Sequence, residues 1–409
     1  MPRLTHKPAD GINALDVSIL VFLVGLVSSK ALLAIGMVLV CLTAIWYYNH
    51  QLRNGPLVKY FLPPLLIFIM TLLSGINSED SASWLAFVSK KSPFLFLPIA
   101  FYISREQVGR RFYDYLMTFV VIVAIVSLGV LTNYLMNFDA LNQAIEKGQA
   151  ISTPVDHTEY SIFVAFACLV SLFLYNEEKR VIRIGTKGTL LLLSLFLFIF
   201  LHVLAVRSGL AVLYLSGIAM GLYTVITRKN YKLLAGMMVF FVVAPIIAVN
   251  IVPSLKKKMS YANWDLGQYK EGKGLNYSDS ERLYSLQVGV EIFKEHKLVG
   301  TGIGDLKAAC QKLYQEKLGR KINHFPHNQI LFVLAGMGFV GLGFYLLAAF
   351  LPLIYMRGHY DPYFLALHCI VFLSAMVENT VERTFSIGFY LFFLLSSICY
   401  LTRTWGQAK

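Results

Sequence analysis

The chain has 409 residues, of which 57% are hydrophobic and only 14% are charged. Soluble domains carry about 25% charged residues, so this composition excludes an ordinary soluble protein and indicates an integral membrane protein. The formal net charge of +13 does not indicate nucleic-acid binding, because the lysines and arginines cluster in gaps between apolar segments, as topology signals do. The five cysteines are too scattered for a disulfide framework, and no Cys/His zinc spacing occurs.

Twelve apolar runs follow one another along the chain, each about as long as a bilayer-spanning helix. Helices are expected because lipid cannot satisfy exposed backbone groups. The runs are 15–29, 31–48, 60–76, 84–103, 115–136, 159–175, 189–206, 209–227, 231–252, 328–356, 361–378 and 384–402. Val17 to Val27 could be the centre of a signal peptide, but Lys30 and a second run follow without a small-residue cleavage site, so we expect a retained span. The sequence predicts an all-α polytopic membrane protein with about twelve transmembrane helices.

Lysine and arginine are distributed unevenly between the two sides that these runs define. If the N-terminus is cytoplasmic, 17 of the 36 lie on the cytoplasmic side, six in the short outer loops and 13 in one long outer loop. Long loops cross the membrane largely regardless of charge, so this distribution places both termini inside. The chain then divides into nine transmembrane helices in 1–252, an outer loop domain in 253–326 and three transmembrane helices in 327–409.

The long loop, 253–326, is polar and basic, and we expect part of it to be helical. Ser278 and Glu281 have the spacing of a capping box and predict a helix that ends near Lys297. Apolar residues recur at helical intervals along it and predict an amphipathic helix: Leu283, Leu286, Val290 and Phe293.

A glycine-rich turn, Gly300–Gly304, follows this predicted helix. Asp305 can then cap a second helix, which stops at Gly319. A glycine-rich turn before a helix can bind phosphate through free backbone amides. This turn follows a helix rather than a strand, so the nucleotide-binding fingerprint does not apply, and a tight turn between two helices is favoured.

The loop ends in His324-Phe325-Pro326-His327-Asn328, immediately before the tenth apolar run. Pro326 suits the first turn of a helix, which places His327 at a helix N-terminus on the membrane surface. The positive end of a helix disfavours a charged imidazole, so His327 should stay neutral and able to accept a proton, as a general base must. The alternative is a polar residue that satisfies backbone groups at a helix end.

Four segments resemble the signature of the O-antigen ligase and polymerase superfamily. They are Pro326–Leu331 continuing through Gly336, Gly338, Gly341 and Leu342; Glu281-Arg282-Leu283 through His296–Gly304; Val206–Gly209; and Glu378-Asn379 with Glu382-Arg383. The resemblance is strongest over the C-terminal half, whereas the first 150 residues agree in hydropathy only.

The resemblance implies a GT-C type glycosyltransferase of the bacterial inner membrane, with its active site facing the periplasm. It also implies a glycan donor on undecaprenyl pyrophosphate, an acceptor hydroxyl that attacks the anomeric carbon with inversion, and no metal or other cofactor. An O-antigen ligase that uses lipid A-core as acceptor is placed first. An O-antigen or exopolysaccharide polymerase and a protein O-oligosaccharyltransferase are alternatives within the family. A lipid-linked oligosaccharide flippase or other transporter is the alternative from another class, but no internal repeat is visible.

Negative charge develops on the pyrophosphate when its bond to the donor sugar breaks, so the site should supply fixed positive groups. Arginine meets phosphate bidentately and keeps its charge. Arg207 is the first candidate, because it interrupts apolar sequence between two spans; the alternative is an arginine that snorkels to headgroups. Arg282 is a candidate because of the family resemblance, since the alternative, a solvated charge, is usual for an isolated loop arginine. With His327 they form the predicted catalytic set.

Four further residues are candidates for binding pyrophosphate or acceptor: Lys90, Lys91, Asn328 and Glu378. The two lysines break the fourth run, and because neighbouring residues point to different helix faces, one at most should face a cavity. Lysine snorkelling at the interface is the alternative. Glu378 is expected to orient an arginine or bind the acceptor sugar, or else only to end a helix. Asn328 is expected to hold His327 or the start of its helix in place.

Overall fold

The computed structural model describes residues 11–46, 55–176, 187–229, 231–271, 278–320, 322, 324–356 and 361–406. Over these ranges the regular secondary structure is entirely helical, which confirms the predicted all-α class. Segment 177–186, which contributes to the predicted cytoplasmic charge, lies outside the described residues.

Each predicted apolar run corresponds to a helix or to two consecutive helices. These helices are α1 Ala14–Ser28, α2 Lys30–Trp46, α3 Leu65–Leu73, α4 Ser81–Lys91, α5 Pro93–Ile103, α7 Phe112–Met136, α9 His157–Asn176, α10 Lys187–Leu204, α11 Arg207–Arg228, α12 Tyr231–Ile251, α16 Gln329–Tyr355, α17 Pro362–Val377 and α18 Thr384–Gly406. The long loop adds α13 Pro253–Lys270, α14 Ser278–Glu295 and α15 Leu306–Leu318. Short connecting helices are α6 Arg105–Arg110, α8 Phe138–Glu146, η2 Gly55–Tyr60, η3 Ser74–Asn77 and η6 Thr380–Glu382.

Several of these helices are able to cross a membrane. Among the described residues, seven segments are both long and apolar enough: Ser81–Ile103, Phe112–Met136, His157–Tyr175, Lys187–Leu204, Arg207–Thr227, Gln329–Tyr355 and Thr384–Thr404. An eighth is added if α12 and α13, which meet at 93°, form one broken span. Ala14–Ser28, Lys30–Trp46, Leu65–Asn77 and Pro362–Val377 are apolar but shorter. The protein is therefore a polytopic helical membrane protein, and twelve spans remain a prediction.

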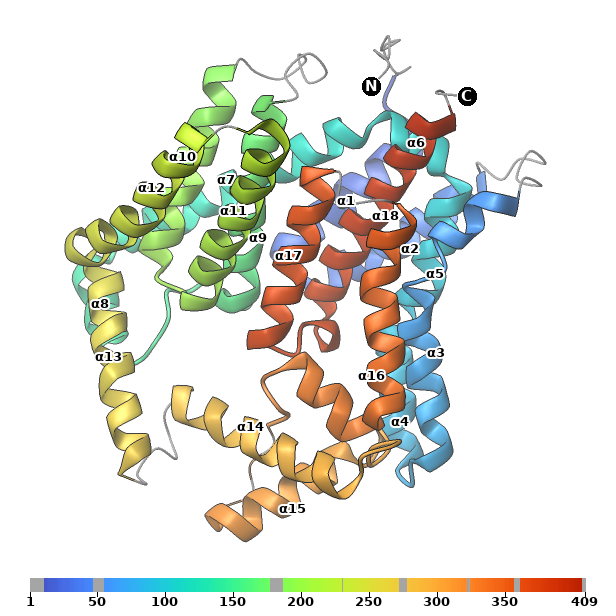
Figure 1. Ribbon diagram of the computed structural model, residues 1–409, viewed down its shortest axis with the longest axis vertical. Helices are drawn as coiled ribbons and strands as arrows, with labels where there is room; N and C mark the ends of the chain where they lie inside the picture. Colours follow the sequence, from blue (N-terminus) through green and yellow to red (C-terminus); the bar gives the residue numbers. More distant parts are fainter. Residues whose placement is uncertain are drawn as a thin grey trace.

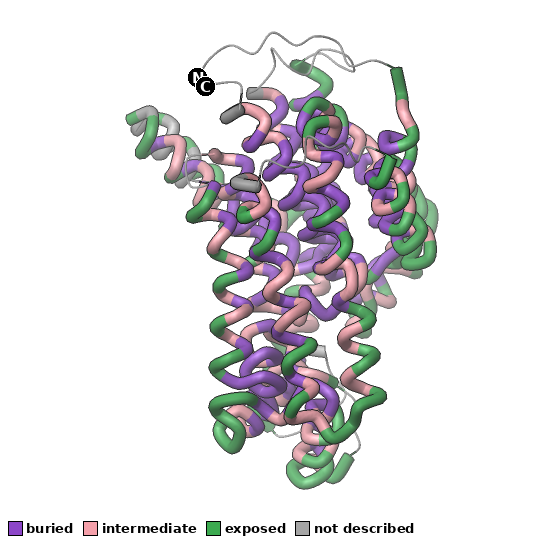
Figure 2. Tube along the Cα trace, turned by 90° about the vertical axis from the view of Figure 1, so that its right-hand side faces the viewer, coloured by how far each residue is buried: buried purple, intermediate pink, exposed green. Residues whose placement is uncertain are grey.

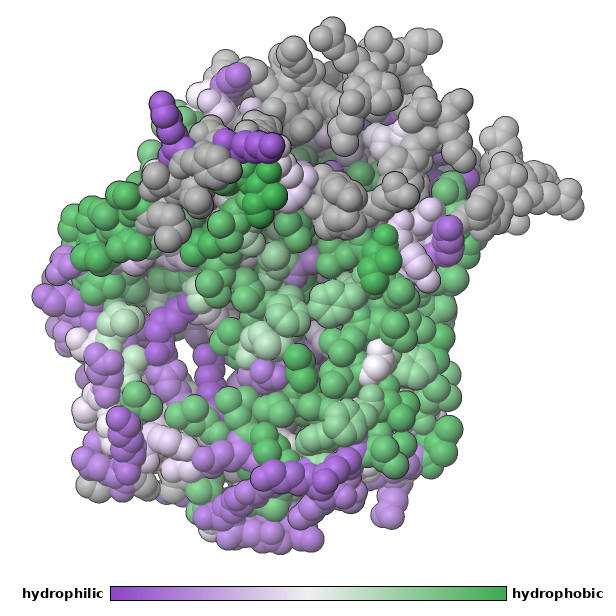
Figure 3. Space-filling model, in the orientation of Figure 1, coloured by the Kyte–Doolittle hydropathy of each residue, from purple (hydrophilic) through white to green (hydrophobic). Residues whose placement is uncertain are grey.

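The bundle is built around α9 and α18, whose spanning segments are mostly buried inside the protein. Aromatic side chains fill the space between them and α7, and Phe393 lies 4.7 Å from Phe119 and 4.8 Å from Phe166 between ring centroids. Buried residues gather along the middle of the bundle and exposed residues along its outside (Figure 2). A broad hydrophobic surface covers the bundle, while hydrophilic side chains gather over the loop helices (Figure 3).

The loop helices α14 and α15 lie at one end of the molecule, opposite the start of α1 and the end of α18 (Figure 1). Helix α14 begins at Ser278, whose side chain lies outside the described residues, and ends two residues before the predicted end. Its predicted apolar residues are only half-buried, and the buried positions are Ser280, Ser285, Val288, Gly289 and Ile292. The buried face is therefore rotated from the predicted one, because α14 packs against α16 and α13 rather than on one apolar surface.

The glycine-rich turn, Gly300–Gly304, is a packing element between the loop and the bundle. The amide of Thr301 donates to the Ala335 carbonyl, and the amides of Ile303 and Gly304 donate to the hydroxyls of Ser74 and Ser78. These amides are therefore used within the protein rather than offered to a phosphate. A β-carbon on Gly302, where φ is +86°, would lie 2.5 Å from the carbonyl oxygen of Asn77, so only glycine fits.

Asp305 precedes α15, as predicted, but its side chain does not cap that helix. Its two carboxylate oxygens accept the amides of Glu79 and Asp80 at 2.7 and 2.8 Å. The predicted helix and its end at Gly319 (φ +65°) are confirmed, whereas the predicted cap is wrong. The carboxylate instead fastens α15 to the segment that leads into α4.

Helix α16 is broken at Gly338, where φ is +62° and ψ is −161°. The break frees the amides of Phe339 and Val340, which donate to the carbonyls of Lys297 and Leu298. The segment after α14 thus completes the hydrogen bonding of α16. This contact and the Asp305 contact join the loop domain to the bundle.

Candidate active site

A cavity of about 280 Å³ lies where the loop domain meets the ends of the bundle helices. Its walls come from the end of α8, the start of α9, the α10–α11 junction, α13, α14 and the segments before α16 and after α17. In Figure 1, α14 runs below the ends of α9, α11 and α17, which places the cavity between them. Figure 3 shows a hollow bordered by hydrophilic side chains on this face. Arg207, Arg282, His327 and Glu378 all line this one cavity.

Arg207 is the first residue of α11, directly after a sharp junction in which Ala205 has φ of +55°. Its Nη2 donates to both carboxylate oxygens of Asp279, each at 2.6 Å. The amide of Asp279 in turn donates to Asp265 on α13, which is fully buried. Arg207 is 38% exposed, so it is held in place from one side and remains accessible from the cavity.

Glu378, at the C-terminal end of α17, contacts two arginines and His327. Its carboxylate lies 2.5 Å from Arg282, 3.2 Å from Arg383 and 3.1 Å from Nδ1 of His327, and its side chain is 4% exposed. Burial alone would raise the pKa of Glu378, but the hydrogen bond from His327 and the charges of Arg282 and Arg383 outweigh burial and lower that pKa. Glu378 is therefore a carboxylate that binds all three groups.

His327 is oriented from both ends. Its backbone amide donates to the hydroxyl of Ser285 on α14 at 3.1 Å, and its Nδ1 faces Glu378. When Nδ1 carries the proton and donates to the carboxylate, Nε2 is left as the acceptor on the opposite side of the ring. The pair has the geometry of an imidazole held by a carboxylate, which is how a histidine base is commonly oriented.

Asn328 is the N-cap of α16. Its Oδ1 accepts the amide of Leu331 at 3.0 Å, and its Nδ2 donates to the carbonyl of Met376 at 2.9 Å. Asn328 does not line the cavity. It joins the start of α16 to the end of α17, next to His327 and Glu378, and its role in positioning them stays a prediction.

The two lysines of α4 point to different sides of the helix, as side chains at neighbouring positions do. Lys91 is 2% exposed and donates to Glu382 at 2.6 Å and to the carbonyl of Val381, so it does not line the cavity. One of the two lysines at most is expected to face a cavity, and Lys91 is the one that packs inside the protein. Lys90 is exposed and lies in an adjoining cleft of about 330 Å³, which His327 and Arg383 also line. Lys90 is thus beside the cavity, and Lys91 anchors the 380–382 turn.

Arg383 also lines the cavity, although it is not among the candidates chosen from the sequence. Its Nη1 lies 3.2 Å from Asp156, and its Nη2 lies 3.2 Å from Glu378. Burial favours its neutral form, but the carboxylates of Glu378, Asp156 and Glu159 outweigh burial and raise the pKa of Arg383. A signal was present, because Arg383 is a cation in a short outer loop between two apolar runs, just as Arg207 is.

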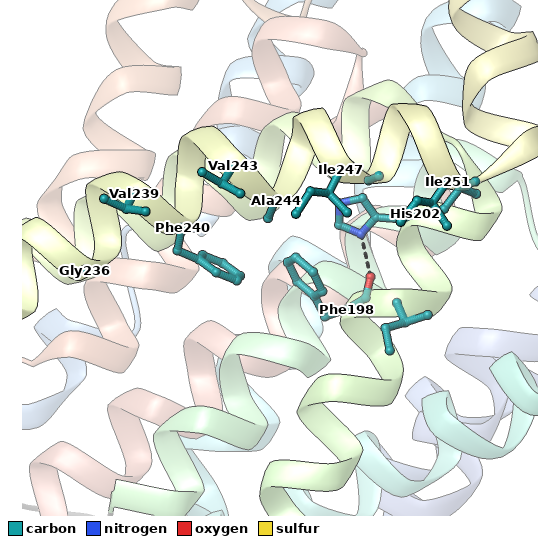
Figure 4. A pocket seen from close by; sticks show the side chains of 12 residues that line it. Phe198, His202, Gly236, Val239, Phe240, Val243, Ala244, Ile247 and Ile251 are labelled. Carbon is teal, nitrogen blue, oxygen red and sulfur yellow. Dashed lines mark hydrogen bonds between the residues drawn. The ribbon is translucent and has the colours of Figure 1, made fainter.

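A second, apolar cavity of about 520 Å³ runs between α10 and α12. Phe198 and His202 of α10 face Phe240, Val243 and Ile247 of α12 across it (Figure 4). The imidazole of His202 is satisfied by the Phe198 carbonyl, drawn in Figure 4, and by the Tyr214 hydroxyl, each at 2.8 Å. The walls are otherwise hydrocarbon, so this cavity suits a lipid chain.

Both helices that form the apolar cavity continue to the polar one. Helix α10 leads within a few residues to Arg207, and α12 bends at Val252 into α13, whose Lys258 lines the polar cavity. The two cavities therefore lie next to each other along the same two chain segments. In the described part of the chain, no three His, Cys, Asp or Glu side chains are grouped closely enough to hold a metal ion.

The comparison with protein families agrees with the motifs. The model of the O-antigen ligase family matches residues 192–346, a segment that begins in α10 and ends in α16. It contains Arg207, Arg282 and His327, whereas Glu378 and Arg383 lie beyond it. No curated protein matches the chain. The family model covers less than half of the chain, and together with the motifs it supports a relationship to the O-antigen ligase and polymerase superfamily.

Proposed function

We propose that the protein is an inverting, metal-independent glycosyltransferase that moves a glycan from undecaprenyl pyrophosphate to an acceptor hydroxyl at the periplasmic face of the inner membrane. The observation that carries the proposal is the convergence of Arg207, Arg282 and Arg383 with the Glu378–His327 pair in one cavity. Permanent cations at a lipid-adjacent cavity suit a diphosphate leaving group.

The proposed reaction has one displacement step. The acceptor hydroxyl oxygen attacks the anomeric carbon, the bond from that carbon to the diphosphate oxygen breaks, and its electron pair leaves with undecaprenyl pyrophosphate. The hydroxyl proton passes to Nε2 of His327, and Glu378 stabilises the imidazolium that forms. Arg207 and Arg282 stabilise the charge that develops on the diphosphate.

The apolar cavity beside the site supports a lipid-linked donor. A chain lying between α10 and α12 would bring its head group to the α10–α11 junction, where Arg207 begins α11. Arg207 pairs with Asp279 and Arg282 pairs with Glu378, so the donor diphosphate would compete with two carboxylates for these arginines. Among the activities of this superfamily we favour an O-antigen ligase that acts on lipid A-core. A polymerase and a protein O-oligosaccharyltransferase are the alternatives.

Transfer by purified protein from a synthetic undecaprenyl pyrophosphate glycan tests the proposal. We expect Arg207→Ala and Arg282→Ala each to lower kcat on the order of 10²-fold or more, because fixed charges that face the leaving group are lost. His327→Ala should lower kcat about 10²- to 10⁴-fold with donor binding largely retained. Arg320→Ala and His296→Ala, which do not line the cavity, are the matched controls. Wild-type turnover in either arginine variant would contradict the proposal.

Two further measurements separate the alternatives. Turnover should persist in EDTA, and a loss that a divalent ion restores would overturn the metal-free mechanism. A flippase would show no transfer in detergent. In a gene deletion, loss of all long-chain material from lipid A-core indicates a ligase, whereas single repeat units that stay attached indicate a polymerase.

A further inference from the structure

An open cleft of about 760 Å³ lies on the other side of the polar cavity's wall, between the end of α8 and one face of α13. Its lining residues combine cationic and aromatic side chains: Lys147, Lys256, Lys257, Ser260, Tyr261 and Trp264. Figure 3 shows hydrophilic side chains along the edge of the molecule where α8 and α13 lie, on the left. The function proposed above does not use this cleft.

The α13 side of the cleft is a continuous strip. Lys257, Ser260, Tyr261 and Trp264 recur at intervals of three and four residues, so they share one face of the helix. The strip runs about 10 Å along α13, at 1.5 Å per residue. Trp264 is 47% exposed, and its ring centroid lies 5.7 Å from that of Tyr261. Large aromatic faces are thus presented to solvent beside lysines on a polar helix.

The charge of the cleft favours an anionic ligand. Three lysines stand against one carboxylate, Glu146, which pairs with Lys257 at 2.8 Å. Two positive charges therefore remain uncompensated within the lining. Ammonium groups beside aromatic faces suit a sugar that carries phosphate or carboxylate groups, since the ring faces cover its apolar side and the lysines bind its charge.

The cleft and the polar cavity share one thin wall. Lys147 and Lys257 line the cleft, while their neighbours Gly148 and Lys258 line the cavity. Lys258 donates to the Gly148 carbonyl at 2.9 Å and closes the wall. At Gly148, φ is +88° and a β-carbon would lie 2.5 Å from the ring of Tyr261, so glycine keeps the wall thin.

We propose that this α8–α13 cleft is a binding site for an anionic oligosaccharide, such as a phosphorylated stretch of the acceptor or donor glycan, held beside the polar cavity. Its place in transfer rests on the proposed function, but binding to the cleft does not. A lipid headgroup at the membrane boundary would meet the lysines near the α12–α13 bend. It would not cover Trp264, two turns further along α13.

Binding is measured by calorimetry with the full chain in nanodiscs of uncharged lipid, using a phosphorylated tetrasaccharide and the same sugar after phosphatase treatment. We expect the phosphorylated sugar to bind more tightly, with an affinity that falls as salt rises. A Lys256→Gln, Lys257→Gln double variant should weaken it about tenfold for each charge-assisted bond lost and leave the neutral sugar unaffected. Trp264→Ala should weaken both sugars, and Lys312→Gln on α15 should change neither.

Equal affinity for the two sugars, or unchanged affinity in both the lysine and the tryptophan variants, would overturn the proposal. Transfer assays then assign the source of the ligand. A several-fold rise in KM for the acceptor alone, with kcat unchanged, assigns the cleft to the acceptor glycan, and a rise for the donor alone assigns it to the donor. If neither KM rises, the site has no part in transfer. If the protein shows no transfer at all, the calorimetry still decides whether the sugar binds.

Discussion

Glu378 binds Arg282, Arg383 and His327 at once, so it is the residue whose removal should affect the most contacts in the cavity. Glu378→Gln keeps the shape but removes the charge that orients and stabilises the imidazolium. We expect kcat to fall on the order of 10²-fold with the fold retained. Transfer kinetics and size-exclusion behaviour in detergent check this. A variant with wild-type kcat would show that His327 acts without Glu378.

The lowered pKa of Glu378 gives a prediction for acid stability. Its folded-state pKa lies below its ordinary value of 4.5, so the carboxylate stabilises the folded state fully above that pH. The difference in melting temperature between wild type and Glu378→Gln should be constant from neutral pH down to about 4.5. It should shrink as the pH falls further, through the folded-state pKa. A difference that grows in acid would contradict the ion-pair account.

Lys91 and Glu382 form a buried ion pair that joins α4 to the turn after α17. Removing one partner leaves an uncompensated buried charge, so Lys91→Met should destabilise the protein by about 3–5 kcal/mol. Lys91→Met combined with Glu382→Met should recover much of that loss. Lys90→Met, at the exposed neighbouring position, is the control and should unfold near the wild-type temperature. If Lys91→Met and Lys90→Met have equal melting temperatures, Lys91 does not have this role.

At residue level, the sequence singles out charges that interrupt apolar segments as candidate site residues. Arg207 and Glu378 stand at the ends of apolar helices, where a charge is costly, and both line the cavity. Lys91 satisfied the same criterion, but it is used for packing. Sequence alone could not separate these uses, because the carboxylate that neutralises Lys91 is 291 residues away along the chain.

At the scale of elements, the break in α16 decides how the loop domain is attached. Gly338 combines φ of +62° with ψ of −161°, a region that essentially only glycine occupies, and a β-carbon there would lie 2.3 Å from the backbone of Leu298. Gly338→Ala should therefore cost about 1–3 kcal/mol for the backbone alone, and more for the contact. We expect the Gly338→Ala variant to have a lower melting temperature than the wild type and to be cleaved faster by protease within 253–326.

Gly343 provides a matched control for Gly338. It lies in the same helix, and a β-carbon there would meet no atom within 4 Å. Gly343→Ala should leave stability unchanged or raise it by about 0.5–1 kcal/mol, because glycine weakens a helix interior. If both variants unfold alike, the contact between α16 and the segment after α14 does not hold the loop domain.

Helix positions were predictable because bilayer-length apolar runs have few alternatives to the helix. Helix α13 was not predicted, since it carries three consecutive lysines and no apolar periodicity. The bonding of Asp305 was also missed. A carboxylate one residue before a helix is a good cap by local rules, yet two amides near the start of α4 took its oxygens.

At the scale of the whole molecule, the predicted orientation places 253–326 on the periplasmic side of the membrane. One cysteine is added at each of two exposed lysines, Lys312→Cys in α15 and Lys59→Cys in η2, and the labelling of each variant is compared with that of the wild-type chain, which has five native cysteines. In intact spheroplasts, a membrane-impermeant maleimide should label the α15 variant and label the η2 variant only after lysis. The reverse pattern would invert the topology and place the candidate site in the cytoplasm.

The sequence by itself determined the membrane class, the positions of the apolar helices, the family resemblance and the charged border residues. These features follow from local apolar length, glycine and capping rules, and short motifs, which act within one or two helical turns. Tertiary structure decided that Arg207, Arg282, Arg383 and His327 share one cavity, that Lys91 does not, and that the glycine turn packs instead of binding phosphate. Those outcomes depend on ion pairs and hydrogen bonds between distant segments, whose partners are chosen by packing and desolvation.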